Sequence, residues 1–223
     1  MADSKLARLT YFSSRGRAES IRLLCAAGAI EYEEKSLGVY HPARKTPEFL
    51  ALRATGTLPF AAVPIWEEPD GLVIAQSDAI LRHIARTRGL YGRDAVDAAR
   101  CDMVLSALED MRAEVRQAAT TEPDKRAALR REVVTVTLPR WLGHFERLLA
   151  ANGAGRTWVV GDRMTVADVV LYGAFEILHD NSLEAPYASC PGLAAHGERM
   201  GQKPGIARYR SSPSRFPAQH LPL

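Results

Sequence analysis

The sequence predicts an α/β domain followed by an all-helical domain, and three observations support this prediction. Over residues 1–86, short strand-like runs alternate with amphipathic helical segments. Within this part, two apolar runs flank an Asp-Gly turn, which predicts an antiparallel hairpin. Beyond residue 97, apolar residues recur at helical spacing almost throughout. We therefore predict domains at 1–86 and 97–223, joined by a linker at 87–96 in which two glycines interrupt the periodicity.

The elements of the first part follow from local pattern. Residues 5–10 alternate weakly and predict a strand, residues 17–27 have apolar residues at helical spacing, and residues 31–35 predict a second short strand. Residues 41–55 contain charges and prolines and predict a loop with an irregular helix. The hairpin comes next, from apolar runs at 60–66 and 72–75. A helix then opens at Ser77, whose hydroxyl can cap free backbone N–H groups.

The second part begins with two long amphipathic helices, predicted at residues 98–120 and 125–149. Pro139 lies inside the second of them. Because proline lacks a backbone N–H and clashes with the preceding turn, it implies a kink or a break in this helix.

The clearest local signal of the second part is the segment GDRMTVAD at residues 161–168. Thr165 and Asp168 are spaced as an N-cap and its partner in a capping box. Residues 169–178 are apolar on nearly all sides, which predicts a central, buried helix. We assign Asp168 a structural role. The tail at residues 211–217 is rich in serine and proline and is expected to be extended.

Composition excludes several classes of function. The net charge of +3 comes from 29 basic and 26 acidic residues, too mild a balance to predict nucleic-acid binding. The three cysteines form no CxxC pair, and no Cys/His spacing resembles a zinc site, so we expect no metal. No apolar run approaches the ~20 residues of a membrane span, and the N-terminus has no apolar signal region. We expect a cytoplasmic protein that binds neither membranes nor nucleic acid.

The junction between the first strand and the first helix is the most informative site signal. It places Tyr11 at the carboxyl end of a strand, beside the positive end of a helix dipole. An anion can bind there and accept a hydrogen bond from the phenol. Since no glycine-rich loop is present, the anion need not be a phosphate, and a thiolate is a candidate.

Four segments together carry a resemblance to a known family. They are YFSSRGRAE at 11–19, TLPFAAVPI at 57–65, QSDAI at 76–80 and GDRMTVAD at 161–168. In this order and spacing, they resemble the cytosolic glutathione transferase superfamily, in particular its tyrosine-type branch of sigma, pi, alpha and mu classes. The resemblance covers essentially the whole chain. It implies an N-terminal thioredoxin-like domain and a C-terminal all-helical domain.

The resemblance implies catalytic roles for Tyr11 and Arg17. Tyr11 matches the tyrosine that donates a hydrogen bond to the sulfur of glutathione, which favours the thiolate and lowers the thiol pKa. Arg17 matches an arginine near the sulfur, where it adds positive potential or orients the tyrosine. The alternatives are a surface role for Arg17, and Ser13 or Ser14 as the hydroxyl, because some branches of the superfamily use serine near this turn.

The resemblance also places the peptide backbone of glutathione. Val63 and Pro64 match the pair whose cis peptide bond turns backbone groups toward the cysteinyl part of glutathione. The competing pair ends at Pro59, but Pro64 lies twelve residues before Gln76, close to the family spacing. Ala62 departs from the family, which commonly has Gln or Lys there, and so removes one side-chain contact.

The γ-glutamyl end of glutathione is matched by Gln76 and Ser77, where a helix N-terminus, a hydroxyl and an amide converge on a carboxylate. Asp110 matches the acidic residue that reaches the γ-glutamyl amine from a partner subunit, so a homodimer is implied. Phe60 matches an aromatic residue that inserts into the partner's helical domain in several classes. Each of these residues also has a purely structural alternative: a helix cap, a solvated charge or a core phenylalanine.

The remaining contacts are less well matched. The glycyl carboxylate of glutathione normally meets a basic residue, for which Arg53 is the candidate, with Lys45 and Arg44 as rivals. The acceptor substrate would bind near Phe12, residues 115–120 and the C-terminal tail, in an apolar pocket between the domains. The sequence does not identify the electrophile.

The predicted function is a glutathione transferase with a role in detoxification, which activates its co-substrate glutathione as a thiolate and conjugates it to small hydrophobic electrophiles. One alternative is a binding or structural protein on the same fold, with weak or no catalysis. Another is a glutathione-dependent lipid-peroxide isomerase. A thiol-disulfide oxidoreductase would need a cysteine where this chain has Ser13 and Ser14.

Overall fold

The computed structural model of the protein contains two compact units. The first unit consists of Met1–Arg88 together with Pro204–Ala218, and the second consists mainly of the intervening part of the sequence, Gly89–Lys203. The structure describes residues 6–41, 45–119, 125–153, 158–184, 187 and 189–218. The domain boundaries predicted above stay a prediction, but residues 204–218 pack with the first unit.

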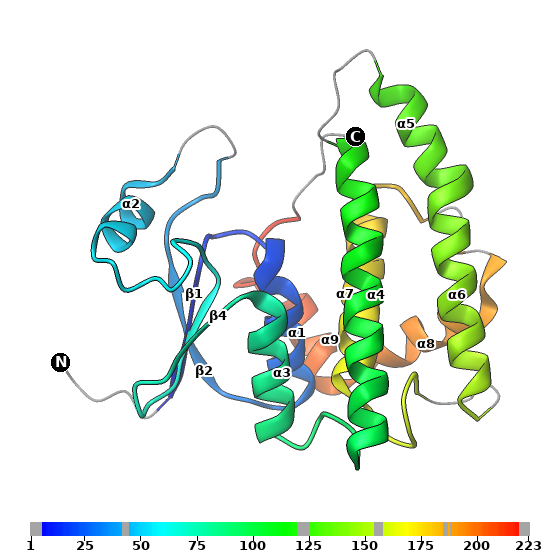
Figure 1. Ribbon diagram of the computed structural model, residues 1–223, viewed down its shortest axis with the longest axis horizontal. Helices are drawn as coiled ribbons and strands as arrows, with labels where there is room; N and C mark the ends of the chain where they lie inside the picture. Colours follow the sequence, from blue (N-terminus) through cyan, green and yellow to red (C-terminus); the bar gives the residue numbers. More distant parts are fainter. Residues whose placement is uncertain are drawn as a thin grey trace. The chain divides into compact units, whose positions relative to one another are not determined.

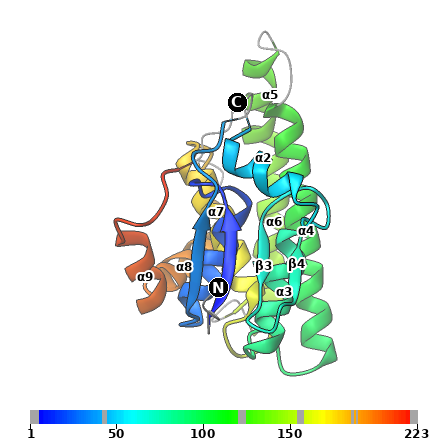
Figure 2. The same ribbon diagram turned by 90° about the vertical axis from the view of Figure 1, so that its left-hand side faces the viewer.

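The described part of the first unit contains a four-stranded sheet with the order β2-β1-β3-β4 (Figures 1 and 2). Strands β1 and β2 are parallel, β3 is antiparallel to β1, and β4 is antiparallel to β3. The elements in chain order are β1 (Ala7–Tyr11), η1 (Gly16–Ala18), α1 (Glu19–Ala27), β2 (Tyr32–Ser36), α2 (Pro47–Ala54), β3 (Ile65–Glu67), β4 (Val73–Ala75), α3 (Ser77–Thr87) and α9 (Pro204–Ser211).

Helices α1 and α3 lie together on one side of this sheet, and α2 lies on the opposite side (Figure 1). The apolar stripes of the two helices supply the core: Ile21 and Leu24 of α1, and Ile80 and Ile84 of α3, are all buried. Burial of such side chains contributes about 1.5–3 kcal/mol each. The βαβ unit, the hairpin and the final helix form the thioredoxin-like domain that the sequence predicts.

Two local predictions are wrong in detail. The strand expected at 60–66 begins only at Ile65, because Pro64 has no N–H to donate to a ladder and Ala61 has a positive φ of 50°. Ser77 does not cap α3, since it is the first helical residue and Gln76 holds the N-cap position. From inside the helix, the Ser77 hydroxyl is one position too late to bond the first free N–H groups.

The regular secondary structure in the described part of the second unit is all helical. The elements are α4 (Ala95–Ala119), α5 (Arg126–Glu132), η2 (Val133–Thr137), α6 (Leu138–Ala151), α7 (Val166–Asp180) and α8 (Pro191–Gly201). No helix in the described ranges is both long and apolar enough to span a bilayer. The prediction of an α/β domain followed by an all-helical domain is confirmed.

Pro139 does not break the helix, and a π-helical turn lies just before it. Helix α5 passes into η2, in which the N–H of Leu138 bonds the carbonyl of Val133, five residues earlier. Because Pro139 supplies no N–H to the preceding turn, widening that turn removes the clash and shifts the hydrogen-bond ladder. Helix α6 then begins directly after η2, with Pro139 in its first turn.

The capping box before α7 is also confirmed. The side chains of Thr165 and Asp168 exchange bonds with each other's backbone N–H groups, and α7 is buried along most of its length. Asp168 additionally accepts from the N–H of Val159 at 2.8 Å and faces His196 Nε2 of α8 at 3.1 Å. One carboxylate therefore ties three segments of the second unit together.

Candidate functional site

The strand register brings three of the predicted site segments to the same edge of the sheet. Thr10 of β1 lies opposite Ile65 of β3, and Ile65 lies opposite Ala75 of β4. One step beyond this row are Tyr11, Pro64 and Gln76. Since β1 and β4 end here while β3 begins here, the start of α3 lies at this edge as well. The sheet thus places a phenol, a proline and a helix N-terminus together.

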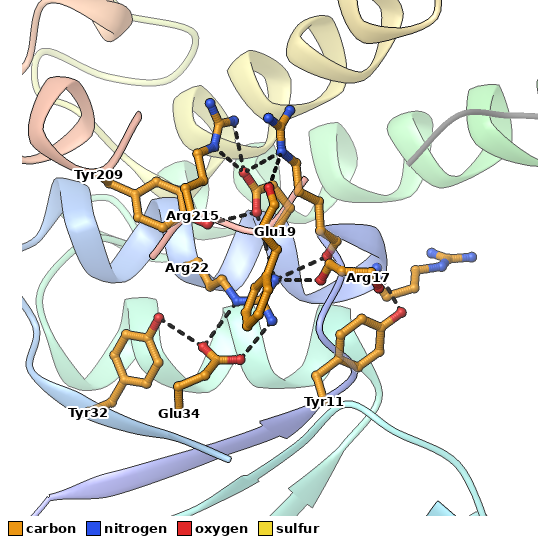
Figure 3. Close-up of polar contacts among 11 residues, drawn as sticks. Tyr11, Arg17, Glu19, Arg22, Tyr32, Glu34, Tyr209 and Arg215 are labelled. Carbon is orange, nitrogen blue, oxygen red and sulfur yellow. Dashed lines mark hydrogen bonds and ion pairs between the residues drawn. The ribbon is translucent and has the colours of Figure 1, made fainter. Parts of the chain in front are cut away.

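Tyr11 is buried, and its hydroxyl oxygen accepts a hydrogen bond from the backbone N–H of Arg17 at 3.1 Å (Figure 3). Arg17 lies in the short helix η1, immediately before α1. Burial raises the pKa of the Tyr11 phenol, although the Arg17 N–H and the Arg22 guanidinium oppose this rise. The phenol therefore keeps its proton at neutral pH and can act as a hydrogen-bond donor.

The rival hydroxyls are placed differently. The Ser13 hydroxyl lies 2.5 Å from that of Ser36, and the Ser13 backbone N–H bonds the carbonyl of Gly38. The Ser14 hydroxyl oxygen is buried and has no hydrogen-bond partner among the described residues. The Ser13 hydroxyl is therefore hydrogen-bonded at the end of β2. Of these hydroxyls, the one bonded by the backbone of η1 is that of Tyr11.

An aromatic cluster joins this junction to α2. Phe12 is buried and packs its ring against those of Tyr11, Tyr40 and Phe49, with centroid distances of 5.3–5.5 Å. Phe12 is thus a core residue, and the structure gives it no exposed surface of the kind that an acceptor substrate would need. Part of the other predicted acceptor segment, residue 120, lies outside the described residues, as do the side chains of 117–119.

The candidates for the glycyl carboxylate lie on or before α2. Arg53 is exposed in the last turn of this helix. Lys45 places its ammonium group 5.8 Å from the ring centroid of Phe49, and Arg44 lies outside the described residues. Thr46 fixes the start of α2 by accepting from the N–H of Phe49 and donating to the carbonyl of Leu37 at 2.6 Å.

The peptide bond between Val63 and Pro64 is cis, as the resemblance implies. Pro64 is buried and Val63 is half-buried. Gln76 has a φ of 72°, in the left-handed region that a glutamine rarely adopts. Such a backbone costs roughly 1–3 kcal/mol and is concentrated at functional sites. Ser77 follows, half-buried, with the free N–H groups of α3 around it.

Two predicted residues are not part of the row formed by Tyr11, Pro64 and Gln76. Asp110 is exposed on α4, in the second unit. Phe60 belongs to the first unit, and 65% of its surface is exposed, so it is not a core phenylalanine. Aromatic residues such as phenylalanine are enriched in protein interfaces relative to the rest of the surface.

A charged network beside Tyr11 was missed by the sequence reasoning (Figure 3). Arg22 has a side chain only 1% exposed and bonds both carboxylate oxygens of Glu34, at 2.7 and 3.0 Å. Glu19 accepts from Tyr209 and from Arg215. One signal in the sequence could have found it. Position 22 shares the helix face of Ile21 and Cys25, and a charge on an apolar face must be paired.

The three cysteines are free and buried, as small apolar residues. Burial raises the pKa of Cys25 to about 12 and raises the pKa values of Cys101 and Cys190 as well. Thiols of this kind are poor nucleophiles at neutral pH. Within the described residues, no group of three or more His, Cys, Asp or Glu side chains could hold a metal ion.

Comparison with known proteins identifies the family. The family models described as the glutathione S-transferase N-terminal domain and C-terminal domain match residues 7–86 and 109–213. A glutathione S-transferase A1 of Mus musculus is 34% identical over 204 residues, covering 90% of this chain and 86% of the mouse protein. The chain belongs to the glutathione S-transferase family.

Further relatives cover nearly the whole chain. A glutathione S-transferase P of Bos taurus is 30% identical over 207 residues, and the aligned region covers 92% of this chain and 91% of the bovine protein. The solved pi-class glutathione S-transferase of Onchocerca volvulus has a TM-score of 0.78 at 27% identity, covering 92% of this chain and 91% of the other. A Caenorhabditis elegans transferase structure reaches 0.81 at 25% identity, covering 96% and 98%. The predicted superfamily and enzyme class are confirmed.

Proposed function

We propose that this transferase binds glutathione at the sheet edge described above and holds its sulfur as a thiolate beside Tyr11. The observation that supports this most directly is the hydrogen bond from the Arg17 N–H to the Tyr11 oxygen. Because that bond occupies an acceptor site of the phenol, the phenolic proton points elsewhere. A donor polarised in this way gives a stronger hydrogen bond to an anionic sulfur.

The proposed chemistry is a nucleophilic substitution or addition. With an aryl halide, the thiolate sulfur forms a bond to the electrophilic carbon, and the halide leaves with the electrons of the broken bond. The thiol proton has already left to solvent. The protein contributes a lower thiol pKa and the proximity of the two reactants. Small hydrophobic electrophiles are the proposed second substrates.

The rest of glutathione extends along the same edge. The backbone of Val63, next to the cis proline, would pair with the cysteinyl peptide groups in the manner of an antiparallel strand. Gln76 and Ser77 would bind the γ-glutamyl carboxylate at the start of α3, where free N–H groups and the helix dipole favour an anion. Arg53, exposed at the end of α2, is the proposed partner of the glycyl carboxylate.

We also propose a homodimer, supported by the exposed ring of Phe60. An aromatic anchor of this kind buries a large apolar area with few rotatable bonds, which is typical of residues that dominate interfaces. In such a dimer, Asp110 of the partner would reach the γ-glutamyl amine. A cytoplasmic setting stays a prediction.

The test is Tyr11→Phe, measured in two ways. Ultraviolet titration of the glutathione complex should show a bound thiol that ionises at lower pH than free glutathione in wild type, and not in Tyr11→Phe. The turnover number with an aryl halide should fall about a hundredfold, as when one donor to a developing anion is removed. Glutathione affinity should change little, since the ring and its packing are kept.

Tyr40→Phe is the matched control, because it removes a phenolic hydroxyl from the same aromatic cluster. It should leave both measurements unchanged. Glutathione binding without turnover in the wild type would favour the carrier alternative. Bound thiol that ionises no more readily than in buffer would refute the proposed mechanism.

A further inference from the structure

The guanidinium of Arg22 lies between two aromatic rings from opposite ends of the chain. It is 5.9 Å from the ring centroid of Tyr11 and 4.6 Å from that of Phe216. Its side chain is only 1% exposed. A desolvated cation over an aromatic face is attracted by the ring quadrupole more strongly than one in water. Phe216 therefore covers and holds a buried charge that touches the catalytic tyrosine.

Arg22 also fixes the turn that follows Tyr11. One terminal nitrogen donates to the carbonyl of Ser14 at 2.8 Å and to that of Arg15 at 3.3 Å. The other nitrogens form the two bonds to Glu34. This turn leads directly into η1, whose Arg17 N–H bonds the Tyr11 oxygen. A displacement of Arg22 would therefore move this turn, and the Arg17 N–H that bonds the Tyr11 hydroxyl would move with it.

The late segment of the chain is bound to the same helix by polar contacts. Arg215 donates twice to one oxygen of Glu19, at 2.9 and 3.0 Å, and Tyr209 donates to the other at 2.8 Å (Figure 3). In return, Arg15 donates to the backbone carbonyl of Phe216 at 3.0 Å. These bonds fix where the Phe216 ring lies over Arg22.

We propose that Phe216 and Arg22 are positioning residues for Tyr11, so that the C-terminal segment sets how strongly bound glutathione is ionised. The inference rests on the proposed function, because it assumes that Tyr11 donates to the glutathione sulfur. Without the Phe216 ring, the guanidinium loses the attraction of an aromatic face, and its bonds to the Ser14 and Arg15 carbonyls are held less firmly. The turn then loosens, and the Arg17 N–H no longer holds the Tyr11 hydroxyl in one orientation.

The experiment compares three variants of the full chain: Phe216→Ala, Phe216→Leu and Phe216→Trp. For each, the thiol of bound glutathione is titrated by ultraviolet absorbance, and glutathione affinity and thermal stability are measured alongside. We expect Phe216→Ala and Phe216→Leu to raise the bound thiol pKa by about half a unit, which lowers the ratio of thiolate to thiol about threefold at a given pH. Phe216→Trp should restore the wild-type value, because it restores an aromatic face.

Phe216→Leu keeps an apolar side chain in place, so it tests the ring itself even if Phe216→Ala does not fold. Ser214→Ala, an exposed position two residues away, is the control and should change nothing. A loss of thermal stability with an unchanged thiol pKa in Phe216→Leu would show a purely structural role and overturn the inference. If wild-type protein itself fails to lower the thiol pKa, the proposed function fails first, and Tyr11→Phe identifies that case.

Discussion

Asp168→Asn tests how much of the second unit depends on one buried carboxylate. Asp168 is fully buried, and its two oxygens serve different groups. One accepts from the Val159 N–H and meets His196 Nε2, and the other accepts from the N–H and hydroxyl of Thr165, all at 2.8–3.1 Å. Because a carboxylate only accepts, both oxygens match the donors around them.

An asparagine keeps the shape of this side chain but replaces one accepting oxygen with a donating NH₂ group. Whichever way the amide turns, its NH₂ group then faces a backbone N–H donor, either that of Val159 or that of Thr165. Leaving a buried donor unsatisfied costs about 1–3 kcal/mol, so we expect a loss of about 2–4 kcal/mol in the free energy of unfolding. A loss of this size is among the larger effects of single substitutions.

Equilibrium unfolding in urea measures the effect. The slope of the unfolding free energy against urea concentration should be the same in both proteins, which shows that the same amount of surface is exposed on unfolding. Asp162→Asn is the matched control, since Asp162 is 66% exposed and pairs with Arg93 at the surface. An exposed pair contributes about 0–1 kcal/mol, so the control should stay close to wild type. If the two variants unfold at the same urea concentration, Asp168 does not have the role that its contacts indicate.

Two further predictions concern pH and association. Burial raises the Cys25 pKa from 9.0 to about 12, so the folded state keeps a proton that the unfolded state releases, and the unfolding free energy should fall above pH 9.0. Cys25→Ala should reduce that fall by about 1.4 kcal/mol per pH unit between pH 9 and 11, and curves of equal slope would contradict it. Phe60→Ser should raise the dimer dissociation constant at least about tenfold in sedimentation equilibrium. Val39→Ser, at a site that is 76% exposed, is the control, and equal effects would remove the proposed anchor role.

Features set by near neighbours in sequence could be predicted well. The Thr165 and Asp168 spacing predicts the capping box because the two groups are three residues apart on one helix turn. The Asp-Gly turn predicts the hairpin, and Tyr11 at a strand end predicts a phenol beside a helix start. The errors are also local. The N-cap of α3 was predicted at Ser77, one residue after the observed N-cap at Gln76. The strand predicted at 60–66 was extended through Pro64, which has no N–H to donate to a neighbouring strand.

Tyr11, Pro64 and Gln76 were named with the help of the family resemblance, and strand pairing is the physical reason that they lie together. Once β1, β3 and β4 pair in register, the residues beyond Thr10, Ile65 and Ala75 must lie together, whatever the loops do. Strand pairing does not fix the position of Arg53 in this way. It lies at the exposed end of α2, outside the sheet, so no register constrains its side chain.

The network around Arg22 shows why the remaining part could not be predicted from pattern. The chain has 29 basic residues, and the sequence pattern alone does not distinguish a buried one from those on a solvated face. What distinguishes Arg22 is its pairing with Glu34 and its cover by Phe216, contacts that join three parts of the chain distant in sequence. A buried charge is stable only when all its partners are in place at once. The loss of one partner leaves the remaining charges uncompensated in a medium of low dielectric constant. The same cooperativity makes Phe216 a sensitive point from which to perturb Tyr11.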